Sequence, residues 1–393
     1  MSHLRKGFLM GVFVLLATPA LSQQDLSPVQ IRAVDWSPTG NQLALGLQSG
    51  TIQVVQPDSS SIILELKADS DTSLYALDWN SDGTQLAVGR SSTIQVWNIE
   101  TGVLLYELQQ QTESIRALDW HPAGRLLATV SQDGFPNNVY VWDVASRENI
   151  FSPVVGDTLA VAWSPNGNVL AISKFGEIQL WDVTSQSQFQ TITTPEYVVS
   201  LAWSPDGRRL ASADTYTPES SAVRIWDTTS GALLDTFEGY AAVVTAITWD
   251  PLGELLVSAS YDGTVRVINV MSDSVVATYN ADGIIFDVAY SPYGGQLAIG
   301  APVRADMAAM QGDSTSVTQL PVQIIVPDPS PERLQAIAAQ CGAPLTVERG
   351  LDAAIAAADY ADVIAQIDAL PAGTIPPACA ADLRAVAAAM QGQ

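Results

Sequence analysis

Trp203-Ser-Pro-Asp-Gly207 is one of seven versions of a five-residue motif that recurs along the 393-residue chain. Each version begins with an aromatic residue, and successive aromatic residues lie between 40 and 46 positions apart. These residues are Trp36, Trp79, Trp120, Trp163, Trp203, Trp249 and Tyr290. A fixed period of this length indicates a repeat protein, in which a single unit cannot bury its apolar faces and neighbouring units share a core.

A second motif follows each first one and ends, in three units, in a Trp-Asp pair. The pairs are Trp142-Asp143, Trp181-Asp182 and Trp226-Asp227, with weaker versions at Trp97-Asn98 and Ile268-Asn269. Apolar and polar residues alternate between the motifs, as in Val223-Arg-Ile-Trp226, and Pro-x-Gly or Asp-Gly pairs separate the alternating runs. Alternation of this kind predicts short strands, and the pairs that contain Gly predict tight turns.

Together the two motifs resemble the WD40 repeat, and the resemblance covers roughly residues 27–328. It implies an all-β, seven-bladed β-propeller over residues 23–328. Blade seven departs from the pattern, because Tyr290 replaces Trp and the second motif ends in Pro327. We therefore expect the N-terminal segment 25–30 to complete the outer edge of blade seven beside residues 322–326, which would remove an exposed sheet edge.

The hydrogen-bond network that the resemblance implies is expected to be incomplete. The Gly-His pair that usually precedes each blade of the family is missing, and Gly239-Tyr240 stands where one such pair is expected. Asp133 and Asp262 keep the position of the network aspartate. Without the His, the buried Asp-His-Ser/Thr-Trp network of the family cannot form as such.

The N-terminus has the pattern of a targeting segment. Arg5 and Lys6 precede the apolar run 8–16, and the small residues Ala20 and Ser22 follow it. This order is typical of a secretory signal peptide over residues 1–22. The apolar run is shorter than the roughly 20 residues that a membrane-spanning helix needs, although an uncleaved membrane anchor is the alternative. We expect a secreted or periplasmic protein with no membrane span after cleavage.

The segment 329–393 changes character, because it is rich in Ala and its apolar residues recur at helical spacing. Ser330-Pro331 reads as a helix N-cap followed by Pro at the first helical position. The segment contains Cys341 and Cys379, the two cysteines of the chain. We predict a small α-helical module held by a disulfide between them, which suits an exported protein; two free thiols or a redox pair are the alternatives.

Composition and motifs argue against several classes of function. The chain has 41 acidic and 17 basic residues and a formal net charge of −24, which disfavours nucleic acid as a partner. His121 is expected to be a turn residue, so no Ser-His-Asp set, metal site or cofactor site is predicted. The carboxylates that recur with the repeat, which are Asp82, Asp143, Asp182, Asp206 and Asp227, are interpreted as turn-forming residues.

The resemblance also implies where a partner binds, because the residues four and six positions before each first-motif aromatic lie on one rim of the ring, the top rim. Arg and aromatic residues recur there and in the loop after the second strand, and such side chains are enriched at protein interfaces. The candidate partner-binding residues are Arg32, Tyr75, Arg90, Arg116, Lys174, Tyr197, Tyr261 and Phe286. Insertions at 132–138, 214–221 and 302–321 fall in the equivalent loops, and insertions on one face commonly mark the binding face.

The basic residues of the rim favour an acidic protein partner, unless they pair with local acids and merely solvate the rim. The sequence thus predicts a non-catalytic protein-interaction scaffold or recognition module of the exported or cell-envelope compartment, which binds through the propeller top face. Two alternatives remain open. One is an exported propeller enzyme, a hydrolase or lyase that uses top-face carboxylates. The other makes the propeller a spacer and assigns recognition to the helical tail.

Overall fold

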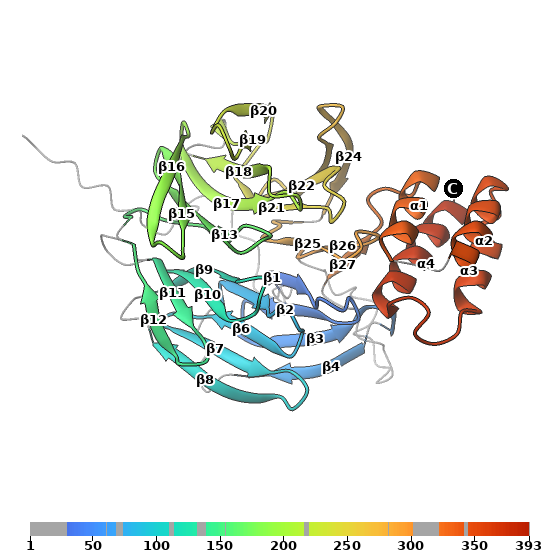
Figure 1. Ribbon diagram of the computed structural model, residues 1–393, viewed down its shortest axis with the longest axis horizontal. Helices are drawn as coiled ribbons and strands as arrows, with labels where there is room; N and C mark the ends of the chain where they lie inside the picture. The colour runs from blue at the N-terminus through green and yellow to red at the C-terminus, as the bar shows by residue number, and fades with distance from the viewer. Residues whose placement is uncertain are drawn as a thin grey trace, which may run out of the picture.

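The computed structural model describes residues 30–59, 61–67, 74–109, 114–131, 139–153, 155–215, 220–281, 283–301, 322–341 and 345–392. A ring of small sheets and a group of four helices beside it make up this part of the chain (Figure 1). The expected signal peptide at 1–22, the segment 25–29, Asp133 and most of the three insertions lie outside the described residues.

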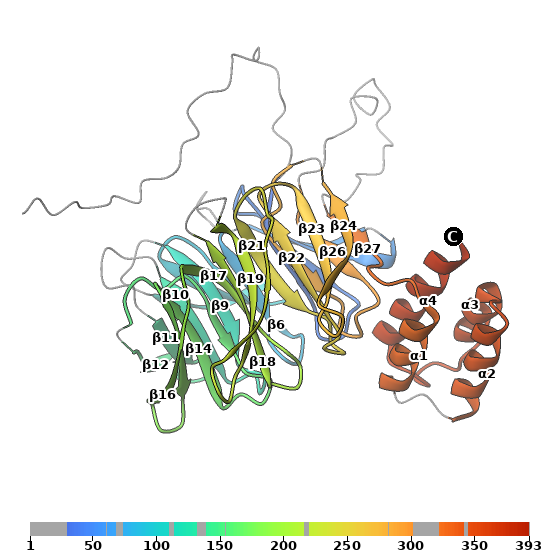
Figure 2. The ribbon, with the colours of Figure 1, turned by 90° about the horizontal axis from the view of Figure 1, so that it is seen from above.

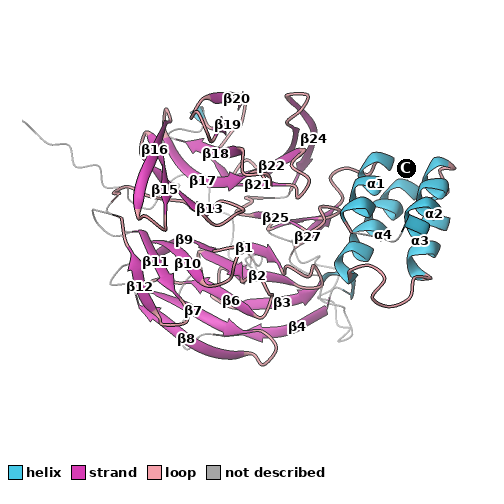
Figure 3. Ribbon diagram, viewed as in Figure 1, coloured by secondary structure: helices cyan, strands magenta, loops and turns pink. Residues whose placement is uncertain are grey.

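The blades follow one another along the chain, and in each blade every strand pairs antiparallel with the next (Figure 3). Blades one to three contain β1 (Ile31–Trp36), β2 (Leu43–Leu47), β3 (Ile52–Gln56) and β4 (Ser61–Leu66); β5 (Ala76–Trp79), β6 (Gln85–Gly89), β7 (Thr93–Asn98) and β8 (Val103–Gln109); β9 (Ile115–Trp120), β10 (Leu126–Ser131), β11 (Val139–Asp143) and β12 (Glu148–Phe151). Blades four to six contain β13 (Val161–Trp163), β14 (Val169–Lys174), β15 (Glu177–Asp182) and β16 (Ser187–Thr193); β17 (Tyr197–Trp203), β18 (Arg209–Thr215), β19 (Ala222–Asp227) and β20 (Leu233–Phe237); β21 (Val244–Trp249), β22 (Leu255–Ser260), β23 (Thr264–Asn269) and β24 (Ser274–Asn280). Blade seven has, within the described residues, β25 (Val288–Tyr290), β26 (Leu297–Ile299) and β27 (Gln323–Ile325).

The first strand of every blade is innermost, and these seven strands contact one another in a closed circle that returns from β25 to β1. The predicted all-β, seven-bladed propeller is therefore confirmed. Its core lies between the blades, where alternate apolar side chains of the second and third strands, such as Leu86 and Val96, are fully buried. Each core cluster draws residues from two successive blades, as expected for units that cannot bury both faces alone.

The first-motif Trp residues join neighbouring blades. In six blades the indole N–H donates to a backbone carbonyl on the innermost strand of the preceding blade. The donor and acceptor pairs are Trp79 with Asp35, Trp120 with Asp78, and Trp163 with Asp119, each at 3.1 Å; Trp203 with Ala162 and Trp249 with Ala202, each at 3.0 Å; and Trp36 with Ala289 at 3.1 Å. At the remaining seam Tyr290 replaces Trp, and its buried hydroxyl has no hydrogen-bond partner among the described residues.

The first-motif turns lie on the face opposite the top rim. In blade five the Ser204 hydroxyl accepts a hydrogen bond from the backbone N–H of Arg209 at 2.9 Å, and Gly207 has a left-handed φ of 68°. The recurring aspartates also bond to turn N–H groups two or three residues further along the chain, and these are Asp82, Asp143, Asp182, Asp206 and Asp227. Their interpretation as turn-forming residues is confirmed.

Part of the family's hydrogen-bond network is present although the His is missing. The hydroxyl of Tyr240 hydrogen-bonds the Ser258 hydroxyl at 2.7 Å inside blade six. The carboxylate of Asp262 accepts a hydrogen bond from the backbone N–H of the residue that follows Tyr240. In blade three the indole N–H of Trp142 donates to the Thr129 hydroxyl at 3.1 Å. The network as such is absent from these blades, as expected, but its serine or threonine position still binds an aromatic residue.

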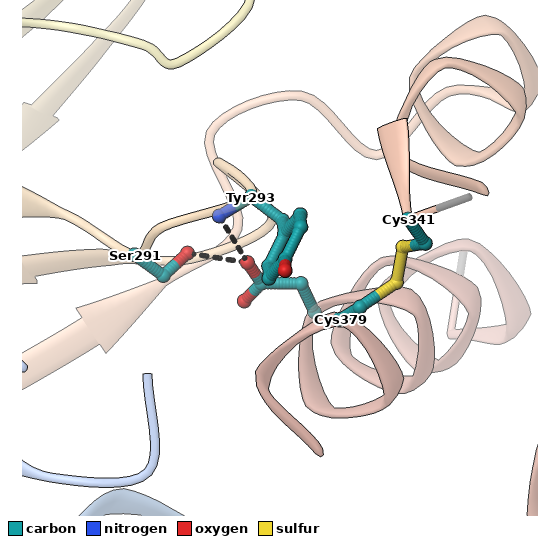
Figure 4. The surroundings of a disulfide bond; sticks show 5 residues. Ser291, Tyr293, Cys341 and Cys379 are labelled. Carbon is teal, nitrogen blue, oxygen red and sulfur yellow. Dashed lines mark hydrogen bonds between the residues drawn. A yellow bond between two sulfur atoms is a disulfide. The ribbon is translucent and has the colours of Figure 1, made fainter. Parts of the chain in front are cut away.

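The C-terminal helices are α1 (Pro331–Gln340), α2 (Leu345–Ala356), α3 (Tyr360–Asp368) and α4 (Pro377–Gln391). Ser330 caps α1, because its side chain accepts a hydrogen bond from the backbone N–H of Arg333, and Pro331 occupies the first turn. Buried apolar residues from all four helices form one core. Cys341 and Cys379 are joined by a disulfide, with Cα atoms 6.0 Å apart (Figure 4). None of the described helices is long and apolar enough to cross a membrane.

The helical module docks on the first-motif turns of blades six and seven. Arg333 on α1 is buried and forms an ion pair with Asp250, with 2.6 Å between Nη1 and Oδ2. The same guanidinium donates to the backbone carbonyl of Gly294 at 2.7 Å. Asp250 also accepts the turn hydrogen bonds of its own blade, so one carboxylate joins the ring to the module. Figures 1 and 2 both show the helices on one side of the ring, next to β27.

A second buried carboxylate completes this junction. Asp382 on α4 accepts hydrogen bonds from the Ser291 hydroxyl at 2.8 Å and from the backbone N–H of Tyr293 at 3.2 Å (Figure 4). The side-chain amide of Gln296 donates to the other carboxylate oxygen at 3.2 Å. Burial raises the pKa of Asp382 to about 6, despite these donors.

Candidate functional site

The predicted rim residues lie where the chain enters the innermost strands and in the turns between second and third strands. Arg32 and Arg116 are near the starts of β1 and β9, Tyr75 immediately precedes β5, and Tyr197 begins β17. Phe286 lies just before β25. These ends of the innermost strands are opposite the first-motif turns, so the residues lie on the face away from the turns that bind the helical module.

Three of the predicted residues form one cluster across blades six, seven and one. The guanidinium carbon of Arg32 lies 4.1 Å from the centre of the Phe286 ring. The ring of Tyr261 meets Phe286 edge-on, with 5.4 Å between ring centres. Tyr261 is 42% exposed, so part of this side chain stays open to a partner. A cation over an aromatic face stabilises both side chains in a fixed position, which prepares them for binding.

Two smaller contacts repeat this arrangement around the rim. The guanidinium carbon of Arg116 lies 4.9 Å from the centre of the Tyr75 ring, which joins blades two and three. Tyr197 contacts Phe175 across blades four and five, with ring centres 4.5 Å apart. Sequence reasoning missed Phe175, which is 48% exposed. Its position directly after Lys174, in the turn between β14 and β15, is the signal that identifies it.

Two predicted basic residues have local partners. Arg90 is 2% exposed; its Nε donates to the Gln95 side chain at 2.8 Å and its Nη2 to the backbone carbonyl of Gly50 at 2.7 Å. The prediction that Arg90 lies on the rim surface is therefore corrected, because its guanidinium is buried between blades one and two. Lys174 forms an ion pair with Glu177 at 3.1 Å, as expected if it solvates the rim.

Carboxylates that the sequence reasoning did not single out lie between the innermost strands. Asp35, Asp78 and Asp119 directly precede the first-motif Trp of blades one to three, and each accepts the backbone N–H of the next blade's Trp. Asp287 accepts the N–H of Val34 in the same way, at 2.9 Å. The signal for the first three is the recurring Asp-Trp pair. These side chains connect neighbouring blades.

Burial raises the pKa of these carboxyl groups, because it disfavours their charged forms. The pKa of Asp35 rises to about 6, and those of Asp119 and Asp287 rise to about 7. Burial and then the nearby charges of Asp35 and Asp119 raise the pKa of Asp78 well above its usual range. Each group is already bound to a backbone N–H, which favours a structural role.

Other chemistry-bearing groups are used within the fold. The Nδ1 of His121 accepts a hydrogen bond from the N–H of Ala123, and its Nε2 lies 3.0 Å from the carbonyl oxygen of Gly167 in the next blade. The expected turn role of His121 is therefore confirmed. Among the described residues, no group of three or more His, Cys, Asp or Glu side chains has the arrangement of a metal site.

Two family models match parts of the ring. The model of Eukaryotic translation initiation factor eIF2A matches residues 51–174 and 108–238. The model of the WD domain, G-beta repeat, matches residues 231–269, which span most of blade six. Both matches fall on the region that the sequence motifs assign to the propeller.

Curated relatives are similar over the same region. Periodic tryptophan protein 2 of Arabidopsis thaliana is 28% identical over 296 residues, which cover 73% of this chain and 32% of the relative. Its Caenorhabditis elegans homolog is 27% identical over 74% of this chain and 27% of the relative. The Chromatin assembly factor 1 subunit FAS2 homolog of Oryza sativa subsp. japonica is 29% identical over 40% of this chain and 34% of the relative. The chain therefore spans about a third or less of the length of these relatives.

The relatives correct the expected location. The N-terminal pattern predicted a secreted or periplasmic protein, whereas the relatives are eukaryotic nuclear or intracellular proteins, among them a chromatin assembly factor subunit. That prediction is wrong, because a charged start followed by a short apolar run is a local pattern that carries no information about the rest of the chain. The repeat matches and the seven-bladed ring together support a WD40-type β-propeller.

Proposed function

We propose that this chain is a non-catalytic protein-interaction scaffold that binds a protein partner through the top rim of its propeller. The observation that carries the proposal is the set of contacts between Arg and aromatic side chains across neighbouring blades. Arg32 with Phe286 and Arg116 with Tyr75 present fixed, partly exposed cationic and aromatic groups. Side chains of these types supply most of the binding energy at protein interfaces.

The relatives and the charge of the chain support a protein partner. Curated relatives that share the repeat include a chromatin assembly factor subunit, a component of an assembly by name. The net charge of −24 repels phosphate backbones over most of the surface. The basic groups of the rim are exceptions on this acidic chain, and they favour an acidic segment of the partner.

The test compares partner capture by the full chain and by a triple variant, Arg32→Ala, Tyr75→Ala and Arg116→Ala. Proteins captured from a eukaryotic cell extract are quantified by mass spectrometry. We expect the amount of specifically captured protein to be at least about tenfold lower with the triple variant, since truncating a central anchor costs about 2 kcal/mol or more of binding free energy. An excess of a glutamate-rich peptide is expected to compete with the same proteins if the partner segment is acidic.

Asp82→Ala is the matched control, because Asp82 stabilises a turn on the opposite face. It is expected to leave capture unchanged. Undiminished capture by the triple variant would refute the top-rim site and assign recognition to the helical module. Competition by a glutamine-rich peptide as strong as that by the glutamate-rich one would refute the acidic character of the partner while leaving the site in place.

A further inference from the structure

One turn position recurs between the third and fourth strands of five blades. It lies five residues after the second-motif aromatic, or after Ile268 in blade six, and its backbone has a left-handed φ of 49° to 73° in each blade. The residues at this position are Gly102, Arg147, Gln186, Gly231 and Asp273. Gly is the residue that adopts this conformation without steric cost, so the three side chains at this position occur despite a small backbone penalty.

In four blades this turn makes a favourable contact with the outer strand of the preceding blade. Gly102 packs on Leu64, and Gly231 packs on Gln190, so closely that a side chain at either glycine would meet its neighbour at 3.0 Å or less. The guanidinium of Arg147 lies 4.8 Å from the centre of the Tyr106 ring. The Gln186 amide donates to the carbonyl of Ile150 at 3.1 Å. Apolar, cation–π and hydrogen-bond contacts therefore stabilise these four seams between blades.

The seam between blades five and six breaks this rule. There Asp273 takes the turn position, and Asp235 on β20 takes the outer-strand position that Tyr106 and Gln190 hold in blades two and four, as the strand pairing shows. Burial and then the charge of Asp273 raise the pKa of Asp235. The charge of Arg209 acts in the opposite direction on this pKa, while its guanidinium stacks on the Trp249 ring and donates to a backbone carbonyl. Within the described part of the chain neither carboxylate forms an ion pair, so two like charges face each other at an exposed edge.

Exposed large apolar side chains lie close in sequence to these two carboxylates. They are Leu233, Leu234, Met271, Val275 and Val276, each within three residues of Asp235 or Asp273, and they are between 42% and 77% exposed. Met271 is the most exposed of the large apolar side chains described. Figure 1 shows β20 and β24, which carry most of these residues, as the outer strands of neighbouring blades. An exposed apolar surface rimmed by charge is characteristic of an interaction site.

We propose that this lower outer edge of blades five and six, defined by these five apolar residues with Asp235 and Asp273, docks a partner segment in which a Lys or Arg stands between apolar residues. The cation would lie between the two carboxylates and remove their repulsion, while the apolar residues cover Met271 and its neighbours. A second copy of this chain is a poor occupant, since its net charge of −24 repels the same edge. This surface is separate from the top rim.

The proposal makes stability and binding change in opposite directions at Asp273. Blades two and five carry Gly at this turn position, so Asp273→Gly removes both the backbone penalty and the like-charge contact. The free protein is expected to unfold at a higher temperature, whereas binding of the basic segment is expected to weaken. A residue that merely completes the fold would not show this opposition.

The binding probe is a fluorescein-labelled peptide of Leu-Arg repeats, titrated with the full chain at physiological salt and followed by fluorescence anisotropy. We expect Asp235→Asn with Asp273→Asn to weaken binding at least about tenfold, because a desolvated cation loses both of its partners. Met271→Ser is expected to weaken binding as well. The matched control, Glu100→Gln with Glu148→Gln, removes the same charge from the equivalent edges of blades two and three and is expected to retain binding.

Several results would overturn the proposal. Equal loss in the two double variants would show a general attraction between the acidic chain and a basic peptide. Equal binding of Leu-Glu or Ser-Arg repeats would remove the charge or the apolar requirement, respectively. Binding to phosphatidylcholine vesicles in place of the peptide would assign the edge to lipid. A dimer in sedimentation that dissociates with Met271→Ser would assign it to a second copy.

Discussion

The ring and the helical module are stabilised in different ways. The ring repeats one contact, the indole N–H to backbone carbonyl bond, at six of its seams, and all ten Trp residues of the chain lie within it. The module has no Trp and depends on one disulfide and on two buried side chains, Arg333 and Asp382, that bind the ring. A repeated contact spreads the stability over many residues, whereas a single junction concentrates it.

Because of this difference, the same type of substitution has unequal effects in the two regions. Loss of one seam contact leaves the others in place, and the core between the blades remains. Loss of one junction side chain leaves a buried charge without its partner, which is the costlier event. Because the module lacks Trp, tryptophan fluorescence reports on the ring, while the helical far-ultraviolet circular dichroism signal reports mainly on the module.

The largest effect is expected from Arg333→Met. It leaves the carboxylate of Asp250 buried beneath α1 without a cation, which typically costs about 3–5 kcal/mol. Urea unfolding is followed by both optical signals, and both midpoints are expected to fall, because Asp250 belongs to the ring and Arg333 to the module. A loss below about 1 kcal/mol would show that the ion pair does not hold the junction.

The rescue variant is Asp250→Ser in the Arg333→Met background. Ser occupies the same turn position in four other blades, for example Ser204, where it accepts the turn hydrogen bonds without a charge. We expect the double variant to regain most of the lost stability. Failure of this rescue would indicate that the Arg333 side chain acts by packing and by its bond to the Gly294 carbonyl.

The next largest effect is expected from Cys341→Ala with Cys379→Ala. A module of about 60 residues has a small core, and removal of its disulfide typically costs about 2–4 kcal/mol. The helical signal is expected to melt at a lower temperature while the midpoint of tryptophan fluorescence changes little. Simultaneous loss of both signals would mean that the ring and the module unfold as one unit. That result would contradict the separate stabilisation of the two regions.

The sequence predicted what the repeat itself specifies. The spacing of the aromatic residues from Trp36 to Tyr290 predicted seven blades, and Ser330-Pro331 predicted the start of the C-terminal helices. The Arg and aromatic residues of the rim were predicted by register, and the structure brings Arg32, Phe286 and Tyr261 together. These features depend on local periodicity, which a single sequence displays.

Features that depend on the neighbouring blade were not predictable in this way. Arg90 is buried because its guanidinium reaches Gly50, 40 residues earlier in the chain, and no local pattern predicts that contact. The pair of Arg333 and Asp250 joins residues 83 positions apart. The Asp-Trp pairs that include Asp78 were visible in the sequence, but their role requires the next blade's N–H to be placed beside the carboxylate.

A smaller effect, which depends on pH, is expected from Asp119→Asn. Burial raises the pKa of Asp119 to about 7 in the fold, so the native state holds a proton that the unfolded chain releases above about pH 4. Stability from this group is therefore lost as the pH rises from about 4 to about 7. The amide keeps an acceptor for the N–H of Trp163 and carries no charge.

The expected result is a gain of about 1 kcal/mol or more at pH 8 and little change at pH 4, measured by urea unfolding followed by tryptophan fluorescence. Asp82→Asn is the control, because hydrogen bonds from Thr84 lower the pKa of that exposed carboxyl. It is expected to show no such gain at the higher pH. An equal change at both pH values for Asp119→Asn would mean that its charge is not the cause.

The smallest effect is expected from Val88→Thr, which gives blade two an internal hydrogen bond that it lacks. The indole N–H of Trp97 is buried in blade two and has no partner in the described part of the chain. Val88 occupies the place that Thr129 holds in blade three, where the threonine hydroxyl accepts from Trp142. Valine and threonine have nearly the same shape, so the new hydroxyl adds an acceptor without a cavity. We expect the variant to gain about 0.5–1 kcal/mol of unfolding free energy, with the reciprocal Thr129→Val losing stability. Because the ring spreads its stability over many seams, neither change is expected to alter the melting of the helical module, and a shift of the helical signal with either variant would contradict the proposed independence of the two regions.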